Sequence, residues 1–162
     1  MQWKDVVHRA PNGLHGKRLS LYTVLSVDAI IDDAIPHWNP TDYQAYRAMH
    51  GDRRLMDEFH RLIEWPRQHI IYETTGGDHA MNRTLRIARE AQAAGYRVDL
   101  QFHAVTPERV AKCVRRRNRI QKRQVSPEDM KRVFFEAYIN FARIQARMRR
   151  SHLFDSLTVA TL

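Results

Sequence analysis

With 162 residues, 43% of them hydrophobic and 28% charged, the chain is long enough to bury a core and too apolar to be disordered throughout. Its formal net charge of +9 calls for an anionic partner, such as nucleic acid, an acidic protein or a phosphorylated small molecule. No apolar run approaches the roughly 18 residues that span a bilayer. The single cysteine, Cys113, excludes an internal disulfide, so we expect a cytoplasmic protein.

The first part of the chain is expected to form an irregular lead-in, a strand and two helical segments. Residues 1–17 are polar and interrupted by proline and glycine. SLYTVLSV at 20–27 is almost continuously apolar and rich in β-branched and aromatic residues, as a buried parallel strand would be. DAIIDDAIP at 28–36 predicts one or two helical turns. Residues 37–66 predict a loop and then a helix that is broken near Gly51.

The middle of the chain predicts a strand, a helix and another strand. HIIY at 69–72 is the second strand. The helix after it has one apolar face, with Asp78 as its candidate N-cap and Gly95 as the residue that ends it. YRVDLQFHAV at 96–105 is the third strand.

The last third predicts two helices and a closing strand. Pro107 is suited to the first position of a helix, and residues 126–129 resemble a capping box. LFDSLTVATL at 153–162 is the last strand. Because strands and helices alternate, the sequence predicts a single α/β domain at 1–162 with a parallel sheet flanked by helices.

Acidic and hydroxyl side chains follow the first two strands. Asp28 comes directly after one strand, and Glu73, Thr74 and Thr75 come after the next. Ligands of open parallel sheets bind beyond the carboxyl ends of the strands, so the two carboxylates are expected to face one crevice. The two glycines that follow would let backbone N–H groups approach a ligand. The alternative is that Glu73 and the threonines only cap a strand-to-helix turn.

Arginines crowd into RVAKCVRRRNRIQKRQ at 109–124. On a helix, Arg116, Arg119 and Arg123 lie three or four residues apart, so their guanidinium groups share a face. The planar guanidinium suits phosphate oxygens, and phosphoryl transfer needs positive charge over the transferring group. The alternative is a solvated basic face with non-specific affinity for nucleic acid.

Three stretches in the same order carry a resemblance to a known family. They are LSVDAIIDDAIPHWNP at 25–40, HIIYETTGGD at 69–78 with AREAQAAGYRVDLQFHAVTPERVA at 88–111, and RRRNRIQKRQVSPEDMKRVFFEAYINF at 115–141. Over roughly three-quarters of its length the chain resembles the zeta-toxin family of P-loop kinases, and more loosely chloramphenicol phosphotransferase-like kinases. The resemblance implies the P-loop kinase fold.

The resemblance also implies roles for particular residues. Asp28 would receive the proton of a substrate hydroxyl, and Glu73, Thr74 and Thr75 would hold the substrate. The lid arginines would contact ATP phosphates, and they are Arg116, Arg119 and Arg123. The implied reaction is phosphorylation of a nucleotide-sugar such as UDP-N-acetylglucosamine with ATP and Mg²⁺, and the implied protein partner is an antitoxin.

The nucleotide half of the pattern departs from the family. A P-loop kinase has a strand, GxxxxGK[ST] and a helix before the first of these strands. Here the sequence is RAPNGLHGKRLSLYTVLSVD. Its GK pair makes Lys17 a candidate phosphate ligand, but Pro11 stands at the first glycine position and Arg18 at the hydroxyl position. We therefore expect an incomplete first strand and P-loop, which would remove most of the activity.

Several interpretations of function stay open. The nine histidines show no metal-ligand spacing, so no metal site is predicted. One interpretation is a zeta-toxin-like kinase or a degenerate relative of one. Another is a non-catalytic basic module that binds nucleic acid or an acidic protein partner. A third is that the chain is a fragment whose P-loop lies upstream or on a partner chain.

Overall fold

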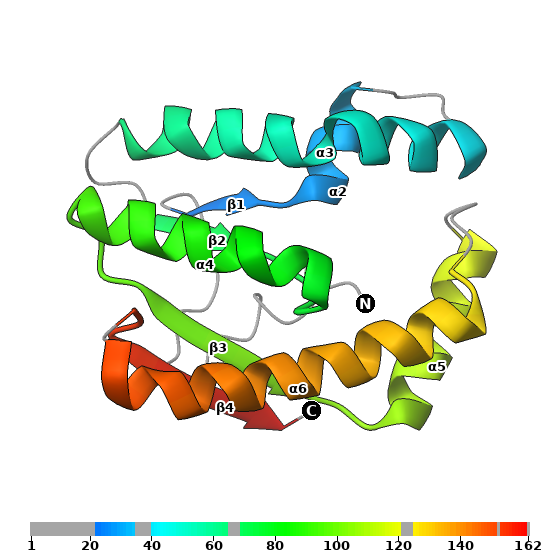
Figure 1. Cartoon of the computed structure of the whole chain (residues 1–162). Coiled ribbons are helices and arrows are strands. Elements are labelled where there is room, and N and C mark those ends of the chain that lie inside the picture. The colour runs from blue at the N-terminus through cyan, green and yellow to red at the C-terminus, as the bar shows by residue number, and fades with distance from the viewer. Residues whose placement is uncertain (1–21, 35–39, 65–68, 121–124, 152, 162) are drawn as a thin grey trace. The chain divides into compact units, whose positions relative to one another are not determined.

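The structure is a computed structural model, and it describes residues 22–34, 40–64, 69–120, 125–151 and 153–161 (Figure 1). The chain divides into two compact units, Met1–Glu73 and Thr74–Leu162, and each is described by itself. The lead-in predicted at 1–17 lies outside the described residues. The single-domain organisation stays a prediction.

The first unit contains two parallel strands and two helices. They are β1 (Tyr22–Leu25), α2 (Val27–Ala34), α3 (Pro40–Ile63) and β2 (His69–Tyr72). The strands pair in parallel from Tyr22 opposite His69 to Leu25 opposite Tyr72, as the sequence predicts. The predicted strand at 20–27 is too long at its carboxyl end, because Val27 already belongs to α2.

Helix α3 runs unbroken through Gly51, so the predicted break there is wrong. Gly51 is buried, and a β-carbon at this position would lie 3.3 Å from Cγ1 of Val27 and 3.8 Å from Cδ1 of Ile31. Both neighbours belong to α2. The absence of a side chain at Gly51 therefore allows α2 to approach α3 closely. The neighbouring helical turns keep α3 intact, although glycine has a low helix propensity.

The core of the first unit forms where α2, α3 and β1 meet. The spacing of Leu55, Phe59 and Leu62 predicts one buried face of α3, and all three side chains are at most 2% exposed. Leu25 and Ile31 contribute the equally buried side chains of β1 and α2. This packing fixes the end of β1 and the start of α2 relative to α3.

The second unit contains three helices and a second pair of parallel strands. They are α4 (Asp78–Ala93), β3 (Asp99–Ala104), α5 (Pro107–Ile120), α6 (Pro127–Ser151) and β4 (Ser156–Thr161). Strands β3 and β4 pair from Asp99 opposite Ser156 to Ala104 opposite Thr161. The predicted α/β class with parallel strands is confirmed in both units. No helix in the described segments has the length and apolarity needed to cross a membrane.

Helix α6 runs along β3 (Figure 1). Aromatic rings of the two elements pack on each other. Phe102 of β3 stacks on Phe141 with ring centroids 4.1 Å apart and meets Tyr138 edge-on. The Tyr138 hydroxyl donates to the carbonyl oxygen of Val105 at 2.8 Å and accepts from its N–H at 3.1 Å. These contacts hold α6 in a fixed register along β3.

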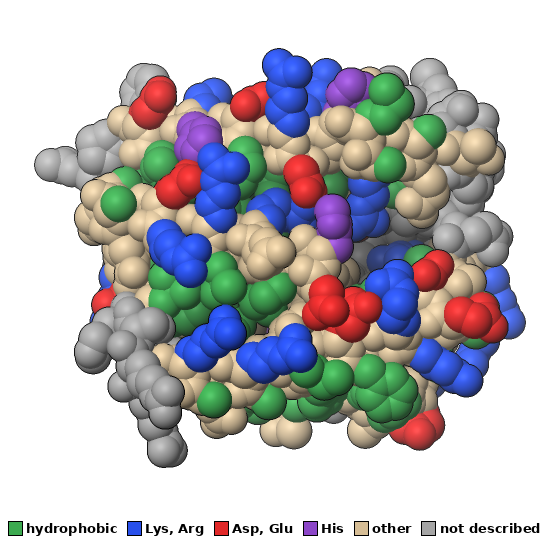
Figure 2. All heavy atoms as spheres, viewed as in Figure 1, with side chains coloured by type: hydrophobic (Ala, Val, Ile, Leu, Met, Phe, Trp, Pro, Cys, Tyr) green, Lys and Arg blue, Asp and Glu red, His purple; other side chains and the backbone are tan. Residues whose placement is uncertain are grey.

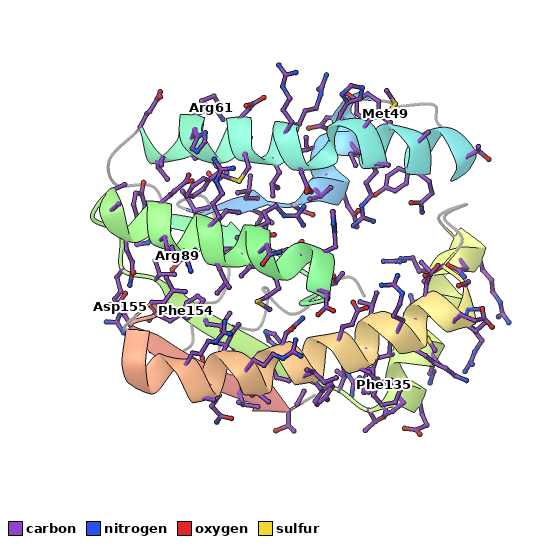
Figure 3. All side chains as sticks on the ribbon, viewed as in Figure 1. Met49, Arg61, Arg89, Phe135, Phe154 and Asp155 are labelled. Atoms are coloured by element: carbon purple, nitrogen blue, oxygen red, sulfur yellow. The ribbon has the colours of Figure 1, made fainter. Side chains whose placement is uncertain are left out.

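A buried cluster joins α4, α6 and the segment that leads into β4. Its fully buried members are Ala88, Ile144 and Phe154. Phe154 and Asp155 lie at the turn between α6 and β4 (Figure 3). The Asp155 carboxylate accepts the N–H of Val98 at 2.7 Å, and the Asp155 N–H donates to the carbonyl oxygen of Val98 at 2.8 Å. The start of β3 is thereby tied to the start of β4.

Most of the predicted helix ends are confirmed. Gly95 ends α4 at a φ of +84°. Ser126 accepts the N–H of Asp129 at 3.0 Å and donates to its carboxylate, which is a capping box with aspartate at its third position. The prediction for Asp78 is wrong, because Gly77 is the N-cap of α4 and Asp78 is the first helical residue.

Candidate active site

Asp28 lies in the first turn of α2, three residues after the end of β1. The carbonyl oxygen of Ser26 accepts the N–H of Ile30 at 3.1 Å, so the helix starts immediately after the strand. Ser26 and Val27 are buried, whereas the Asp28 side chain is 36% exposed. A carboxylate in this position interacts favourably with the N-terminal end of the helix and is accessible to a ligand.

Two residues of α3 contact the Asp28 carboxylate. The Tyr43 hydroxyl donates a short hydrogen bond to Oδ1 of Asp28. One guanidinium nitrogen of Arg47 lies 3.8 Å from the same oxygen. Tyr43 is fully buried, but the Arg47 side chain is 41% exposed. The two residues are one helical turn apart, so α3 presents both to α2 and fixes the direction of the carboxylate.

Glu73 comes directly after β2. Asp28 follows β1 at the same edge of this sheet. Its N–H donates to the carbonyl oxygen of Leu25 at 3.0 Å, next to the pairing of Leu25 with Tyr72. The Oε1 atom of Glu73 is buried. Both candidate carboxylates therefore leave the carboxyl ends of paired parallel strands within the first unit, where ligands of such sheets bind.

In the second unit, the predicted substrate threonines begin the Thr74–Gly77 loop. The Thr74 hydroxyl accepts the N–H of Gly76 at 3.3 Å, and Gly76 has a φ of +72°. Thr75 is exposed, whereas Gly77 is buried. A β-carbon on Gly77 would lie 2.9 Å from a carboxylate oxygen of Glu136. These glycines permit a close approach to helix α6, and the approach of a ligand to their backbone N–H groups stays a prediction.

Helix α5 carries the arginine element. Arg115, Arg116 and Arg119 are exposed on it, which agrees both with a phosphate-binding face and with the alternative of a solvated basic face. The Asn118 side chain accepts the N–H of Val125 at 3.2 Å and donates to its carbonyl oxygen at 3.1 Å, which joins the end of α5 to a residue two positions before α6. Two further candidates, Arg123 and Lys17, lie outside the described residues.

The comparison with protein families assigns the chain. The sequence pattern of one family, Zeta toxin, matches residues 31–160, about four-fifths of the chain. The chain belongs to the zeta toxin family. No curated protein and no solved structure matches it. The predicted family is thereby confirmed. The helices and short parallel strands of the structure are consistent with the P-loop kinase-like fold of this family.

The zeta toxin match includes most of the candidate residues but not all. It contains Glu73, the two threonines and the arginines of the lid element, whereas Asp28 and Lys17 precede it. The expectation of an incomplete P-loop stays a prediction. The individual roles of the candidate residues stay predictions.

Several exposed arginines in the described part of the chain could donate hydrogen bonds to the phosphate groups of a nucleotide. The exposed guanidinium groups of Arg115, Arg116 and Arg119 offer the planar donors that phosphate oxygens accept. Within the segments described, no group of three or more histidine, cysteine, aspartate or glutamate side chains is arranged to hold a metal ion. Magnesium in phosphoryl-transfer sites takes only one or two protein carboxylates, with the remaining ligands from phosphates and water.

Four further residues that contact the candidate segments are not predicted from the sequence. In the first unit, Tyr43 and Arg47 contact Asp28. In the second unit, Asn140 contacts Gly76, and Glu136 accepts the N–H of Asp78 directly after the loop. Each pair is spaced by four residues on one helix, which is the only signal the sequence offers for them.

Replacing Tyr43 with phenylalanine is expected to lower the free energy of unfolding by about 1–2 kcal/mol, because a partly buried hydrogen bond to a carboxylate is lost. Urea denaturation checks this. Tyr46→Phe on the same helix is the matched control, because the ring contacts of Tyr46 with His50 and Arg54 do not use its hydroxyl. An equal loss of stability in the two variants would contradict the assigned role of the Tyr43 hydroxyl.

Proposed function

We propose that the protein is a zeta-toxin-like kinase, or a degenerate relative, that binds a nucleotide-sugar and phosphorylates a hydroxyl group on it. Family membership supports the class of reaction. The observation that carries the proposal is the carboxylate of Asp28, which is oriented by Tyr43 and Arg47 beyond the end of β1. Glu73 follows the adjacent strand and supplies a second acceptor of hydrogen bonds.

Asp28 acts as the proton acceptor in this proposal. The hydroxyl proton of the substrate moves to the carboxylate, and the substrate oxygen becomes able to form a bond to phosphorus. Arg47 lies 3.8 Å from this carboxylate, which stands in the first turn of α2. The Tyr43 hydroxyl directs the carboxylate, so less reorganisation is required when the substrate is bound.

The remaining candidates bind rather than react. Glu73, Thr74 and Thr75 hold hydroxyl and amide groups of the sugar through hydrogen bonds. ATP with Mg²⁺, when bound, supplies the phosphoryl group. The positive charge over its phosphates comes from the lid arginines, which are Arg116, Arg119 and Arg123, with Lys17 as a further candidate. An antitoxin of acidic character would suit the net charge of +9.

The exposed arginines of α5 favour a second candidate function. A non-catalytic basic module that binds nucleic acid would use the same guanidinium groups and would not need Asp28 or Glu73. Its affinity would fall steeply with salt, because phosphate binding by arginine releases counterions. The two functions therefore differ in which residues and which conditions control binding.

Calorimetric titration separates the two functions. The full chain is expected to bind UDP-N-acetylglucosamine and ATP, and Glu73→Gln is expected to weaken sugar-nucleotide binding about tenfold, since one charged acceptor is lost. Glu64→Gln, an exposed residue outside the site, is the matched control. Absence of binding at millimolar UDP-sugar and ATP, together with salt-sensitive binding of nucleic acid that survives Asp28→Ala, would replace the kinase by the basic module.

A further inference from the structure

The Thr74–Gly77 loop is held by side chains from α6, more than fifty residues further along the chain. Acidic and basic side chains lie next to one another over the N-terminal half of α6 (Figure 2). The N-terminal half of α6 contacts the loop through polar groups and through close packing. All of these contacts lie within the second unit.

Asn140 is the buried centre of these contacts. It is 3% exposed, and its side-chain amide donates to the carbonyl oxygen of Gly76 at 3.1 Å and to the Asp78 carboxylate at 2.8 Å. The amide oxygen of Asn140 accepts from Arg143 at 3.3 Å. A buried amide is costly unless its groups are paired, so this arrangement fixes both ends of the glycine pair relative to α6.

Glu136 lies one turn earlier on the same face of α6. Its Oε2 atom accepts the N–H of Asp78 at 3.0 Å, which satisfies a backbone donor in the first turn of α4 from another helix. Its Oε1 atom accepts from Arg132 at 3.0 Å. Arg132 also donates to the carboxylate of Asp129 in the capping box of α6. The pKa of Asp129 is lowered, first by the hydrogen bond from Arg132 and then by that from Ser126.

The two glycines bring the loop against the backbone of α6. A β-carbon on Gly76 would lie 3.2 Å from Cβ of Ala137, and one on Gly77 would also approach Val133 at 3.5 Å. Polar contacts and close packing from one face of α6 thus act on three consecutive residues, which are Gly76, Gly77 and Asp78. The exposed side of α6, where Phe135 projects away from these contacts, takes no part (Figure 3).

We propose that Glu136 and Asn140 are positioning residues, which hold the Thr74–Gly77 loop so that the Thr74 and Thr75 hydroxyls stand ready for the substrate. The inference rests on the proposed function, because it takes the two threonines as substrate-binding residues. The hydrogen bonds of the loop are made before any ligand arrives, so binding does not carry the entropy cost of ordering the loop. Arg132 and Asp129 extend the contacts from the loop to the start of α6.

Three variants of the full chain test the proposal. Glu136→Ala removes the acceptor for the Asp78 N–H, Glu136→Gln retains an acceptor oxygen, and Gln145→Ala changes an exposed residue elsewhere on α6. Circular dichroism confirms folding in each case. The first measurement is hydrogen exchange of the Gly76 and Asp78 amides without ligand. The second is the Kd for UDP-N-acetylglucosamine.

Glu136→Ala is expected to speed exchange of the two amides about tenfold and to weaken sugar-nucleotide binding by a similar factor, while Glu136→Gln and Gln145→Ala stay within about threefold. If Glu136→Ala speeds amide exchange but leaves the Kd unchanged, Glu136 has a structural role and not a positioning role. If Glu136→Ala leaves the exchange rates unchanged, the hydrogen bond from the Asp78 N–H to Glu136 does not hold the loop. If the wild-type protein binds no sugar nucleotide, the proposed function fails and the positioning role fails with it, whereas the exchange rates still decide whether α6 holds the loop.

Discussion

Replacing Asp28 with asparagine is expected to lower the rate of phosphoryl transfer about 10²- to 10⁴-fold, which is the range for loss of a general base. The amide oxygen still accepts the hydrogen bond from Tyr43, but the side chain no longer takes up a proton. The expected change lies in the chemical step and not in substrate binding. Single-turnover transfer from ATP to UDP-N-acetylglucosamine, followed by product mass, measures it.

Asp33→Asn is the matched control for this prediction. Asp33 is an exposed carboxylate on the same helix α2, so the variant carries the same change in charge away from the site. Its transfer rate is expected to stay within about twofold of the wild type, as for other exposed substitutions. An Asp28→Asn protein that transfers phosphate at the wild-type rate would remove Asp28 from the chemistry.

The sequence predicts which segments form helices and strands better than it predicts the residues at which they begin and end. Hydrophobic patterns identify HIIY as strand β2, and the proline and capping patterns identify the starts of α5 and α6. The errors arise where packing outweighs local propensity. Gly51 has low helix propensity, yet it lies inside α3 because α2 needs the space that its missing side chain leaves. Val27 continues the apolar run of β1, yet it is already helical.

The candidate site is only partly visible in the sequence, for a related reason. Asp28 and Glu73 are recognisable because each follows a strand, and the register of β1 with β2 brings these strand ends to one edge. Tyr43 and Arg47 come from a different helix, and nothing near them in the sequence marks Asp28 as their partner. Asn140 lies within the apolar pattern of α6, where its burial depends on a carbonyl group 64 residues away.

The zeta toxin match begins at residue 31, after Asp28 and the GK pair. The contacts described for the proposed substrate residues involve the strand ends of the first unit and, in the second unit, the loop next to α6.

Replacing Gly76 with alanine is expected to lower the free energy of unfolding by about 2–5 kcal/mol. Its φ of +72° is a left-handed conformation that costs an L-residue about 1–2 kcal/mol. The added methyl group would also meet Cβ of Ala137 at 3.2 Å, and such overpacking typically costs about 1–3 kcal/mol. Urea denaturation followed by circular dichroism measures the change.

Gly95→Ala separates the two causes, because Gly95 has a similar φ of +84° but its added β-carbon would meet no atom within 4 Å. It is expected to lose only the conformational part, about 1 kcal/mol, partly offset by the lower entropy of the unfolded alanine chain. The difference between the two variants then reports the packing of the Thr74–Gly77 loop on α6. Equal losses would mean that the loop does not lie against Ala137 in solution, and the positioning of Thr74 and Thr75 by α6 would lose its basis.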